Sequence, residues 1–324
     1  MSEIRQNILT GEWTIYASNR FGKPYDFKKH PKREAVERKC PFCSGNEEMT
    51  PEPVYANGKD GEWTIRVFPN MYPALSCENL SETNESIYTS ICGMGHHEVV
   101  VDTDDHKLNI HDFTYEQMAD VFWVLRERYI DIKNRDGVNY VQVFKNCGPE
   151  AGASINHSHW QIIGAALGGL QQMLENKNCN EYFDKNGRCL ICDMIKHEKD
   201  EGKRIVAEND KFVAFVPFAS KAAFEVFIVP KEHITGFEQM DRQMTDSLAG
   251  IFKTMLVKVK NIFPGISYNI TFQDSVKGDR CETKHWYARI IPRIGTYAGY
   301  EFGTGSFINP ILPEFAAEKY NNME

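Results

Sequence analysis

The sequence lacks the features of a membrane, secreted or nucleic-acid-binding protein. No apolar run among its 324 residues reaches the ~18 residues of a membrane-spanning helix. The first residues, MSEIRQNILTGEW, contain no apolar signal-peptide core. The net charge is -8, whereas a nucleic-acid backbone favours a basic partner. We therefore expect a soluble, cytoplasmic protein that binds neither membranes nor nucleic acids.

The cysteines do not suggest a disulfide framework. Nine is an odd number, and four of the nine form two Cys-x-x-Cys pairs, Cys40 with Cys43 and Cys189 with Cys192. Without an export signal, this pattern favours reduced thiols that bind metal. A redox role is the alternative, but a redox pair usually follows a strand in a thioredoxin-like unit. The remaining composition, 42% hydrophobic and 25% charged, is that of an ordinary globular protein.

An internal repeat organises the chain, because four segments of the first half recur in order in the second. They are 40–43, 97–106, 140–146 and 157–163 in the first half, and 189–192, 224–233, 268–274 and 285–291 in the second. Glu98 precedes His106 by eight positions, just as Glu225 precedes His233. Tyr140 precedes His157 by seventeen positions, just as Tyr268 precedes His285. The alternative, a β-rich chain that merely repeats short apolar runs, does not account for matched spacing in four segments.

Each repeat predicts the same secondary structure. β-Branched runs and apolar residues at helical spacing indicate strands around an amphipathic helix. The expected strands are 98–101, 140–144, 160–164, 225–229, 268–272 and 286–291, and the expected helices are 115–133 and 243–262. The polar segment 168–187 is the expected linker. We thus predict an α+β fold of two tandem units, 1–170 and 180–324, each a mostly antiparallel sheet packed with helices.

The repeat also predicts two metal sites. A Cys-x-x-Cys pair places two thiolates at the tip of a turn, and tetrahedral zinc needs two further ligands. The histidines that recur in both halves supply them. The expected zinc ligands are Cys40, Cys43, His106 and His157 in the first half, and Cys189, Cys192, His233 and His285 in the second.

The halves differ where chemistry is expected. The first half has HSHWQ at 157–161, and the second has HWYAR at 285–289. Alternate residues of a strand share a face, so His159 and Gln161 point the same way. An imidazole so placed can act as a nucleophile, and the small-residue loop 146–154 can bring backbone N–H groups to a phosphate. The alternative is that His159 is one more core or metal histidine.

His97 has no histidine counterpart in the repeat, because Phe224 takes its position in the second half. We therefore expect a structural role for His97 rather than metal binding.

Taken together, Asn146, Ser154 and the HSHWQ motif resemble the active-site signature of the galactose-1-phosphate uridylyltransferase family, a branch of the histidine-triad superfamily. The resemblance runs nearly end to end. It includes the segments 10–13, 18–24, 68–75 and 299–310. The last of these and the second Cys-x-x-Cys are most similar to the plant-type relatives, the ADP-glucose phosphorylases.

The resemblance implies a role for each matching residue. His159 attacks the α-phosphorus of a nucleotide sugar and carries the nucleotide covalently. The other implied roles are phosphoryl binding for Gln161 and Ser154, site support for Asn146, phosphate contacts for Arg20 and Lys23, nucleotide contact for Asn70, and sugar contact for Tyr300 and Glu301. Many members bind the sugar across a dimer interface, so a homodimer is expected.

The resemblance implies a uridylyltransferase that exchanges UDP-glucose with a hexose 1-phosphate. A phosphorylase that uses inorganic phosphate on ADP-glucose or a similar donor is the alternative in the same mechanism. A zinc-stabilised nucleotide-binding module without turnover is the third reading. Four sites depart from the usual pattern. Lys23 is usually an arginine, and the stretch 221–223 is more aromatic and proline-containing in relatives. Ser158 replaces a proline, and Arg289 stands where plant-type relatives have glutamine; that arginine either binds a small anion or pairs with a carboxylate of the protein.

Overall fold

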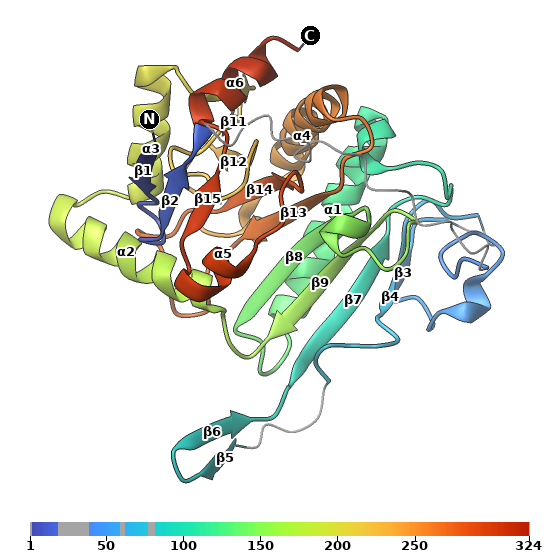
Figure 1. Cartoon of the computed structure of the whole chain (residues 1–324). Helices are drawn as coiled ribbons and strands as arrows, with labels where there is room; N and C mark the ends of the chain where they lie inside the picture. Colours follow the sequence, from blue (N-terminus) through green and yellow to red (C-terminus); the bar gives the residue numbers. More distant parts are fainter. Residues whose placement is uncertain (1, 19–38, 59–61, 77–81, 324) are drawn as a thin grey trace.

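A computed structural model describes residues 2–18, 39–58, 62–76 and 82–323. Within these ranges no helix is both long and apolar enough to cross a membrane. A large antiparallel sheet with helices packed on it dominates the described chain (Figure 1). The predicted α+β class is therefore confirmed.

The large sheet joins the two halves of the chain. In the described residues its strands are β3 (Tyr55–Ala56), β4 (Arg66–Pro69), β7 (Gly95–Val101), β8 (Tyr140–Cys147), β9 (His159–Ala165), β10 (Ile205–Glu208), β11 (Phe212–Phe215), β12 (Val226–Pro230), β13 (Tyr268–Gln273) and β14 (Tyr287–Pro292). Their order is β10-β11-β12-β14-β13-β8-β9-β7-β4-β3, with every pairing antiparallel. The order is symmetric about the β8–β13 pair, so β9 corresponds to β14 and β7 to β12, as the repeat requires.

Two long helices cover one face of this sheet. α1 (Tyr115–Lys133) and α4 (Arg242–Ile262) pack against each other there (Figure 1). The side chain of Thr114 caps α1 and that of Asp241 caps α4, each by accepting a backbone N–H hydrogen bond. The predicted apolar stripes of both helices lie in the core between helices and sheet, so both predicted helices are confirmed within a residue of their bounds.

The segment predicted as a linker is a helix, α2 (Leu170–Asn186). Its buried residues are Gln172, Glu175 and Cys179, which follow helical spacing but are mostly polar. Gln172 and Glu175 are buried because they hydrogen-bond to Tyr140 and Tyr287 of the sheet. A polar inner face gives no hydrophobic periodicity, which is why the pattern did not reveal this helix.

The remaining elements lie around the second half and at the margin of the first. They are α3 (Leu190–Glu201), α5 (Gly299–Thr304), α6 (Pro313–Asn321), the 3-10 helices η2 (Glu47–Met49), η3 (Ile110–Asp112), η4 (Pro149–Ala151) and η5 (Phe237–Gln239), and the strands β1 (Glu3–Gln6), β2 (Trp13–Tyr16), β5 (Glu82–Glu85), β6 (Tyr88–Ile91) and β15 (Phe307–Asn309). β1, β2 and β15 form a small sheet in which β15 runs parallel to β2. The β5–β6 hairpin projects from the body (Figure 1).

The register of the large sheet decides which way the predicted nucleophile points. Gln161 of β9 pairs with Phe144 of β8, and paired residues share a face. Trp160 lies between His159 and Gln161 in sequence and is fully buried in the core beneath α1 and α4. Because side chains alternate along a strand, His159 and Gln161 face away from those helices.

An aromatic cluster holds the two halves together in this core. Phe272 of β13 is 1% exposed and lies at its centre. Five rings lie 5.0 to 6.4 Å from it, centroid to centroid: Phe122, Trp160, Phe237, Phe252 and Trp286. These rings come from both halves of the chain, so the core is shared between them.

The substitution Phe272→Ala should destabilise the whole protein by about 3–5 kcal/mol, because it opens a cavity among packed rings. The free energy of unfolding in denaturant measures this loss. The same change at Phe302, which is 81% exposed, serves as the control and should alter stability by no more than about 0.5 kcal/mol. Equal effects of the two substitutions would contradict the central place of Phe272.

Candidate active site and metal centres

The first predicted metal site is assembled in the structure. Sγ of Cys43 lies 3.3 Å from Nδ1 of His106 and 3.6 Å from Nδ1 of His157. With Cys40, the four donor atoms all lie within 4.8 Å of one another. A tetrahedral zinc, with Zn–S of about 2.3 Å and Zn–N of about 2.0 Å, holds sulfur and nitrogen ligands roughly 3.5 Å apart. The donor set and spacing therefore fit a metal ion such as zinc.

The second site has the same donors but a different cysteine scaffold. Sγ of Cys192 lies 3.4 Å from Nδ1 of both His233 and His285. Cys189 is the N-cap of α3 and Cys192 lies in its first turn, where the positive end of the helix favours thiolates. The predicted turn is present at the first Cys-x-x-Cys pair but is wrong for the second, because an apolar stripe of α3 packs on the sheet and continues the helix.

Backbone carbonyls orient His157 in the first site and both histidines in the second, where Nε2–H of His233 donates to the Cys281 carbonyl at 3.0 Å. Nε2–H of His157 donates to the Thr103 carbonyl at 2.7 Å, and Nε2–H of His285 donates to the Pro230 carbonyl at 3.0 Å. Thr103 stands three positions before the ligand His106, and Pro230 stands three positions before the ligand His233. The bonds leave Nδ1 of each ring free to bind metal, which is the usual arrangement at such sites.

His159 stands at the start of β9 with one ring nitrogen fixed. Its Nδ1 lies 2.8 Å from the His157 carbonyl, which can only accept, so Nδ1 carries the proton. Nε2 then keeps its lone pair. The ring is 6% exposed and packs against the edge of Phe42, and this burial lowers the pKa of the imidazole to about 4. His159 is therefore a neutral imidazole with a free Nε2.

A buried ion pair holds the main chain at His159. Nζ of Lys145, on β8, is 2.8 Å from Oδ2 of Asp102 and donates to the His159 carbonyl at 3.1 Å. It also donates to Oγ of Ser158 at 2.8 Å. The serine that departs from the usual proline is thus a partner of Lys145. Breaking such a buried pair is costly, so this network fixes the backbone of the candidate nucleophile.

Gln161 is held by His97, a residue for which the sequence predicted only a structural role. Nε2 of His97 lies 2.9 Å from Oε1 of Gln161. The amide of Asn70 lies 3.2 Å from the same ring nitrogen. The side chains of Gln161, His97 and Asn70 therefore form one group. The repeat concealed this role, because a site residue that exists in one half only looks like a mismatch. One signal could have found it: His97 stands two residues from Val99 on β7, and Val99 pairs with Gln161, so His97 and Gln161 lie on the same sheet face.

The loop after β8 has the tight geometry that its small residues suggest. Gly148 and Gly152 have φ values of 85° and 87° around η4. A Cβ at Gly148 would meet Oγ of Ser267 at 2.2 Å, so only glycine fits there. Oδ1 of Asn146, at the end of β8, accepts a hydrogen bond from Asn269 at 2.8 Å. Ser154 is exposed on the same loop.

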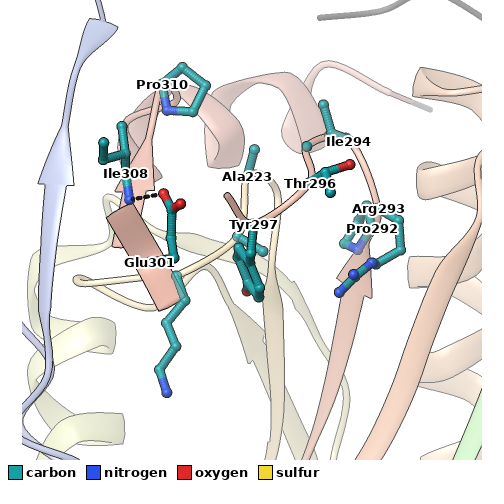
Figure 2. Close-up of a pocket in the computed structure, with 12 residues that line it drawn as sticks. Ala223, Pro292, Arg293, Ile294, Thr296, Tyr297, Glu301, Ile308 and Pro310 are labelled. Atoms are coloured by element: carbon teal, nitrogen blue, oxygen red, sulfur yellow. Dashed lines mark hydrogen bonds between the residues drawn. The ribbon is translucent and has the colours of Figure 1, made fainter. Parts of the chain in front are cut away.

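The remaining predicted site residues are Arg20, Lys23, Tyr300 and Glu301. Arg20 and Lys23 fall outside the described residues. Tyr300 and Glu301 lie on α5, where Glu301 accepts backbone hydrogen bonds from Ala298 and Ile308. Figure 2 shows Glu301 at a pocket whose other lining residues include Lys221, Arg293, Thr296 and Tyr297. The structure thus places His159, Gln161 and Asn146 on one sheet face, with Asn70 joined to Gln161 through His97, and Glu301 lines a pocket that includes none of these residues.

In the second half, the position that corresponds to the nucleophile is closed. Tyr287 replaces His159, and its hydroxyl donates to Glu175 of α2 at 2.8 Å. Arg289 replaces Gln161 and pairs with Glu225 through Nε at 2.8 Å. The predicted alternative in which Arg289 pairs with a carboxylate of the protein is therefore correct. No open catalytic group remains at this position among the described residues.

Comparison with known proteins agrees with this geometry. A family model described as galactose-1-phosphate uridyl transferase, N-terminal domain, matches residues 1–166, and its C-terminal counterpart matches residues 175–292. The chain belongs to the galactose-1-phosphate uridyl transferase family. The resemblance predicted from the sequence is confirmed, and the protein is an enzyme of this nucleotidyltransferase family.

The similar proteins include both a phosphorylase and a uridylyltransferase. ADP-glucose phosphorylase of Arabidopsis thaliana is 33% identical over 98% of this chain and 91% of its own length. A galactose-1-phosphate uridylyltransferase of Thermotoga maritima is 29% identical over 100% of this chain and 99% of its own. Among solved structures, the Arabidopsis thaliana ADP-glucose phosphorylase with bound ADP-glucose superposes with a TM-score of 0.86 and 28% identity, covering all of both chains.

We expect two zinc ions per chain, because both donor sets fit the metal. Structural zinc can supply on the order of 10 kcal/mol of apparent folding free energy, so chelation should destabilise the fold. His157→Ala and His285→Ala should each remove about one zinc per chain, as measured by elemental analysis. His197→Ala, at an exposed position on α3, is the matched control and should keep both. Fully active protein without zinc would contradict this expectation.

Proposed function

We propose that the enzyme transfers a nucleoside monophosphate through Nε2 of His159. The observation that carries the proposal is the hydrogen bond from Nδ1–H of His159 to the His157 carbonyl, which leaves Nε2 as the only nucleophilic ring nitrogen. The side chain stands on the sheet face away from α1 and α4, beside Gln161. A buried group with one fixed nitrogen is preorganised for in-line attack on phosphorus.

The reaction has two balanced displacements. Nε2 attacks the α-phosphorus of a nucleotide sugar, so an N–P bond forms and the P–O bond to the sugar 1-phosphate breaks with its electrons. A phosphate oxygen of the acceptor then attacks the same phosphorus, and the P–N bond breaks to restore the neutral imidazole. Neither step needs a proton at the leaving group, because the first releases the sugar 1-phosphate as a stable anion and the second releases a neutral imidazole.

The two metal sites would have a structural part in this reaction. Zinc bound by Cys40, Cys43, His106 and His157 would anchor the chain immediately before His159 and supply folding free energy. His157 is both a member of that donor set and the owner of the carbonyl that fixes Nδ1 of His159. The position of the nucleophile is thereby tied to the integrity of the first site.

For the acceptor, we propose a hexose 1-phosphate such as galactose 1-phosphate, with UDP-glucose as donor. Tyr297, Thr296 and Glu301 at the pocket of Figure 2 offer the hydroxyl and carboxylate groups that sugar hydroxyls require. In this proposal, residues 1–170 form the catalytic unit and residues 180–324 the structural and acceptor-binding unit. Because Glu301 lines a pocket that does not include His159, a homodimer in which α5, with Tyr300 and Glu301, serves the partner's site is part of the proposal.

Inorganic phosphate as acceptor, with ADP-glucose as donor, is the second candidate. It is favoured by the similarity to the Arabidopsis thaliana ADP-glucose phosphorylase in both sequence and structure. Arg289 gives it no support, since that guanidinium already pairs with Glu225. A binding module without turnover is disfavoured by the free Nε2 of His159.

His159→Ala should lower turnover by on the order of 10³-fold or more, because the covalent path is removed, while zinc content stays unchanged. Initial rates with two substrates should give parallel reciprocal plots for the unaltered enzyme. Intact-mass analysis should find a nucleotidyl adduct on the unaltered enzyme and none on the variant. Intersecting plots, or a His159→Ala variant that keeps half of the activity of the unaltered enzyme, would rule out the covalent route.

The acceptor can be identified by trapping the nucleotidyl enzyme and adding galactose 1-phosphate or inorganic phosphate separately. Under the leading proposal, galactose 1-phosphate discharges the adduct fast and phosphate does not. Glu301→Ala should slow that discharge without loss of the fold, whereas Glu116→Ala on the exposed start of α1 should not. Fast discharge by phosphate alone, from an adduct formed with ADP-glucose, would replace the first candidate by the second.

A further inference from the structure

A carboxamide can stabilise a phosphoryl oxygen with its NH2 group but not with its carbonyl oxygen. Gln161 and Asn146 are the two carboxamides on the sheet beside His159. An unrestrained amide turns either end toward the substrate at little cost, and half of these orientations would repel a phosphate. A site that relies on such groups therefore gains from partners that fix which end points outward.

The orientation of Gln161 is determined by a chain of bonds that ends at a backbone group. The backbone N–H of Ala74 donates to Nδ1 of His97 at 3.2 Å, so this nitrogen is an acceptor. A neutral imidazole with an acceptor at Nδ1 carries its proton on Nε2. Nε2–H then donates to Oε1 of Gln161 at 2.9 Å. The NH2 group of Gln161 is left without a hydrogen-bond partner among the described residues.

His97 is placed firmly enough to act in this way. Its side chain is 9% exposed, and burial lowers the pKa of its imidazole, which favours the neutral form. The NH2 group of Asn70 lies 3.4 Å from Nδ1, which can accept from it, and 3.2 Å from Nε2. A reversed Gln161 would bring its NH2 against Nε2–H, two donors facing each other in a buried place, which is unfavourable.

The orientation of Asn146 is determined in the same manner from the second half of the chain. The Ala151 carbonyl can only accept, and it lies 2.9 Å from one side-chain atom of Asn269, which must therefore be Nδ2. The same Nδ2 lies 2.8 Å from Asn146, and that contact is satisfied when Asn146 presents Oδ1. The NH2 group of Asn146 is then also left without a partner in the described part of the chain.

The register brings both amides to the nucleophile. Gln161 pairs with Phe144 across β8 and β9, and Asn146 follows two residues later on β8. Continuing that antiparallel register sets Asn146 opposite His159. Asn269 pairs with Asn146 across the junction of the halves. His159 is thus flanked by one amide on its own strand and another on the neighbouring strand, and each is held from behind.

We propose that His97 and Asn269 are positioning residues that turn the NH2 groups of Gln161 and Asn146 toward the phosphoryl oxygens during transfer. The inference rests on the proposed function, because it assigns the amides to the phosphorus that His159 attacks. It also gives the second half a part in catalysis through Asn269. The ligand class is the α-phosphoryl group of a nucleotide sugar, whatever its base.

The test measures the rate of nucleotidyl-enzyme formation by rapid quench and intact mass, with UDP-glucose and ADP-glucose as probes. Gln161→Ala should slow it by about 10²–10³-fold, as loss of one such donor does. His97→Phe, which keeps the ring and removes the donor, should slow it by about 10–100-fold. His97→Gln restores an NH2 donor at a similar reach and should recover most of the rate.

Double variants separate positioning from general damage. If His97 acts through Gln161, the pair His97→Phe with Gln161→Ala should be no slower than Gln161→Ala alone. The same should hold for Asn269→Leu combined with Asn146→Ala. Losses that multiply, or no loss in His97→Phe and Asn269→Leu, would overturn the proposal.

Matched controls lie on the same strands. His96→Phe makes the same change one residue away on the opposite face of β7, and Thr271→Val alters β13 two residues from Asn269. Both should form the adduct at the unaltered rate, and all variants should keep their zinc content and melting temperature. If the unaltered enzyme forms no adduct with either probe, the proposed function falls together with this inference. An adduct that forms equally fast in all variants overturns the positioning roles alone.

Discussion

The core and the candidate site both depend on the antiparallel pairing of β8 with β13, which joins the two halves of the chain. It merges what would be two separate sheets, so α1 and α4 meet over one core and Phe272 packs against rings from both halves. It also sets Asn269 against Asn146, one strand away from His159. A change that loosened this pairing would therefore reach the core and the candidate site at once. Each Cys/His donor set includes a histidine just before a strand that neighbours this pair, His157 before β9 and His285 before β14.

The two halves share a fold but not a chemistry, and the difference is physical. In the first half, His159, Gln161 and Asn146 are neutral side chains on one sheet face. Each has a hydrogen-bond partner at one polar atom and, among the described residues, none at the other. In the second half, Tyr287 and Arg289 are bound to carboxylates, and α2 lies over the first of them. A buried tyrosine and a buried arginine with satisfied partners contribute packing and rigidity. In the proposed mechanism, the second half thus serves as a scaffold at the place where the first half is reactive.

The repeat made much of this predictable. Matched spacing identified both metal sites, and period-3.6 and β-branched patterns identified α1, α4 and the central strands. The pattern did not reveal α2, because its buried side chains Gln172 and Glu175 are polar. His97 and Asn269 were missed for other reasons: His97 breaks the repeat, and Asn269 matters only through a strand pairing between halves. Sequence periodicity reports which face of an element is buried, but not which distant strand lies beside it.

The small sheet has a consequence for biosynthesis. β2 pairs in parallel with β15, and Arg5 on β1 is bound to Glu314 on α6, so residues near the start of the chain have partners near position 310. A ribosome completes the first half long before those partners emerge. During that interval the edge of β2 that β15 later covers has no strand beside it, and such edges invite association between nascent chains. Closure of this sheet by β15 is therefore a late event in folding, and it covers an edge that could otherwise pair with another nascent chain.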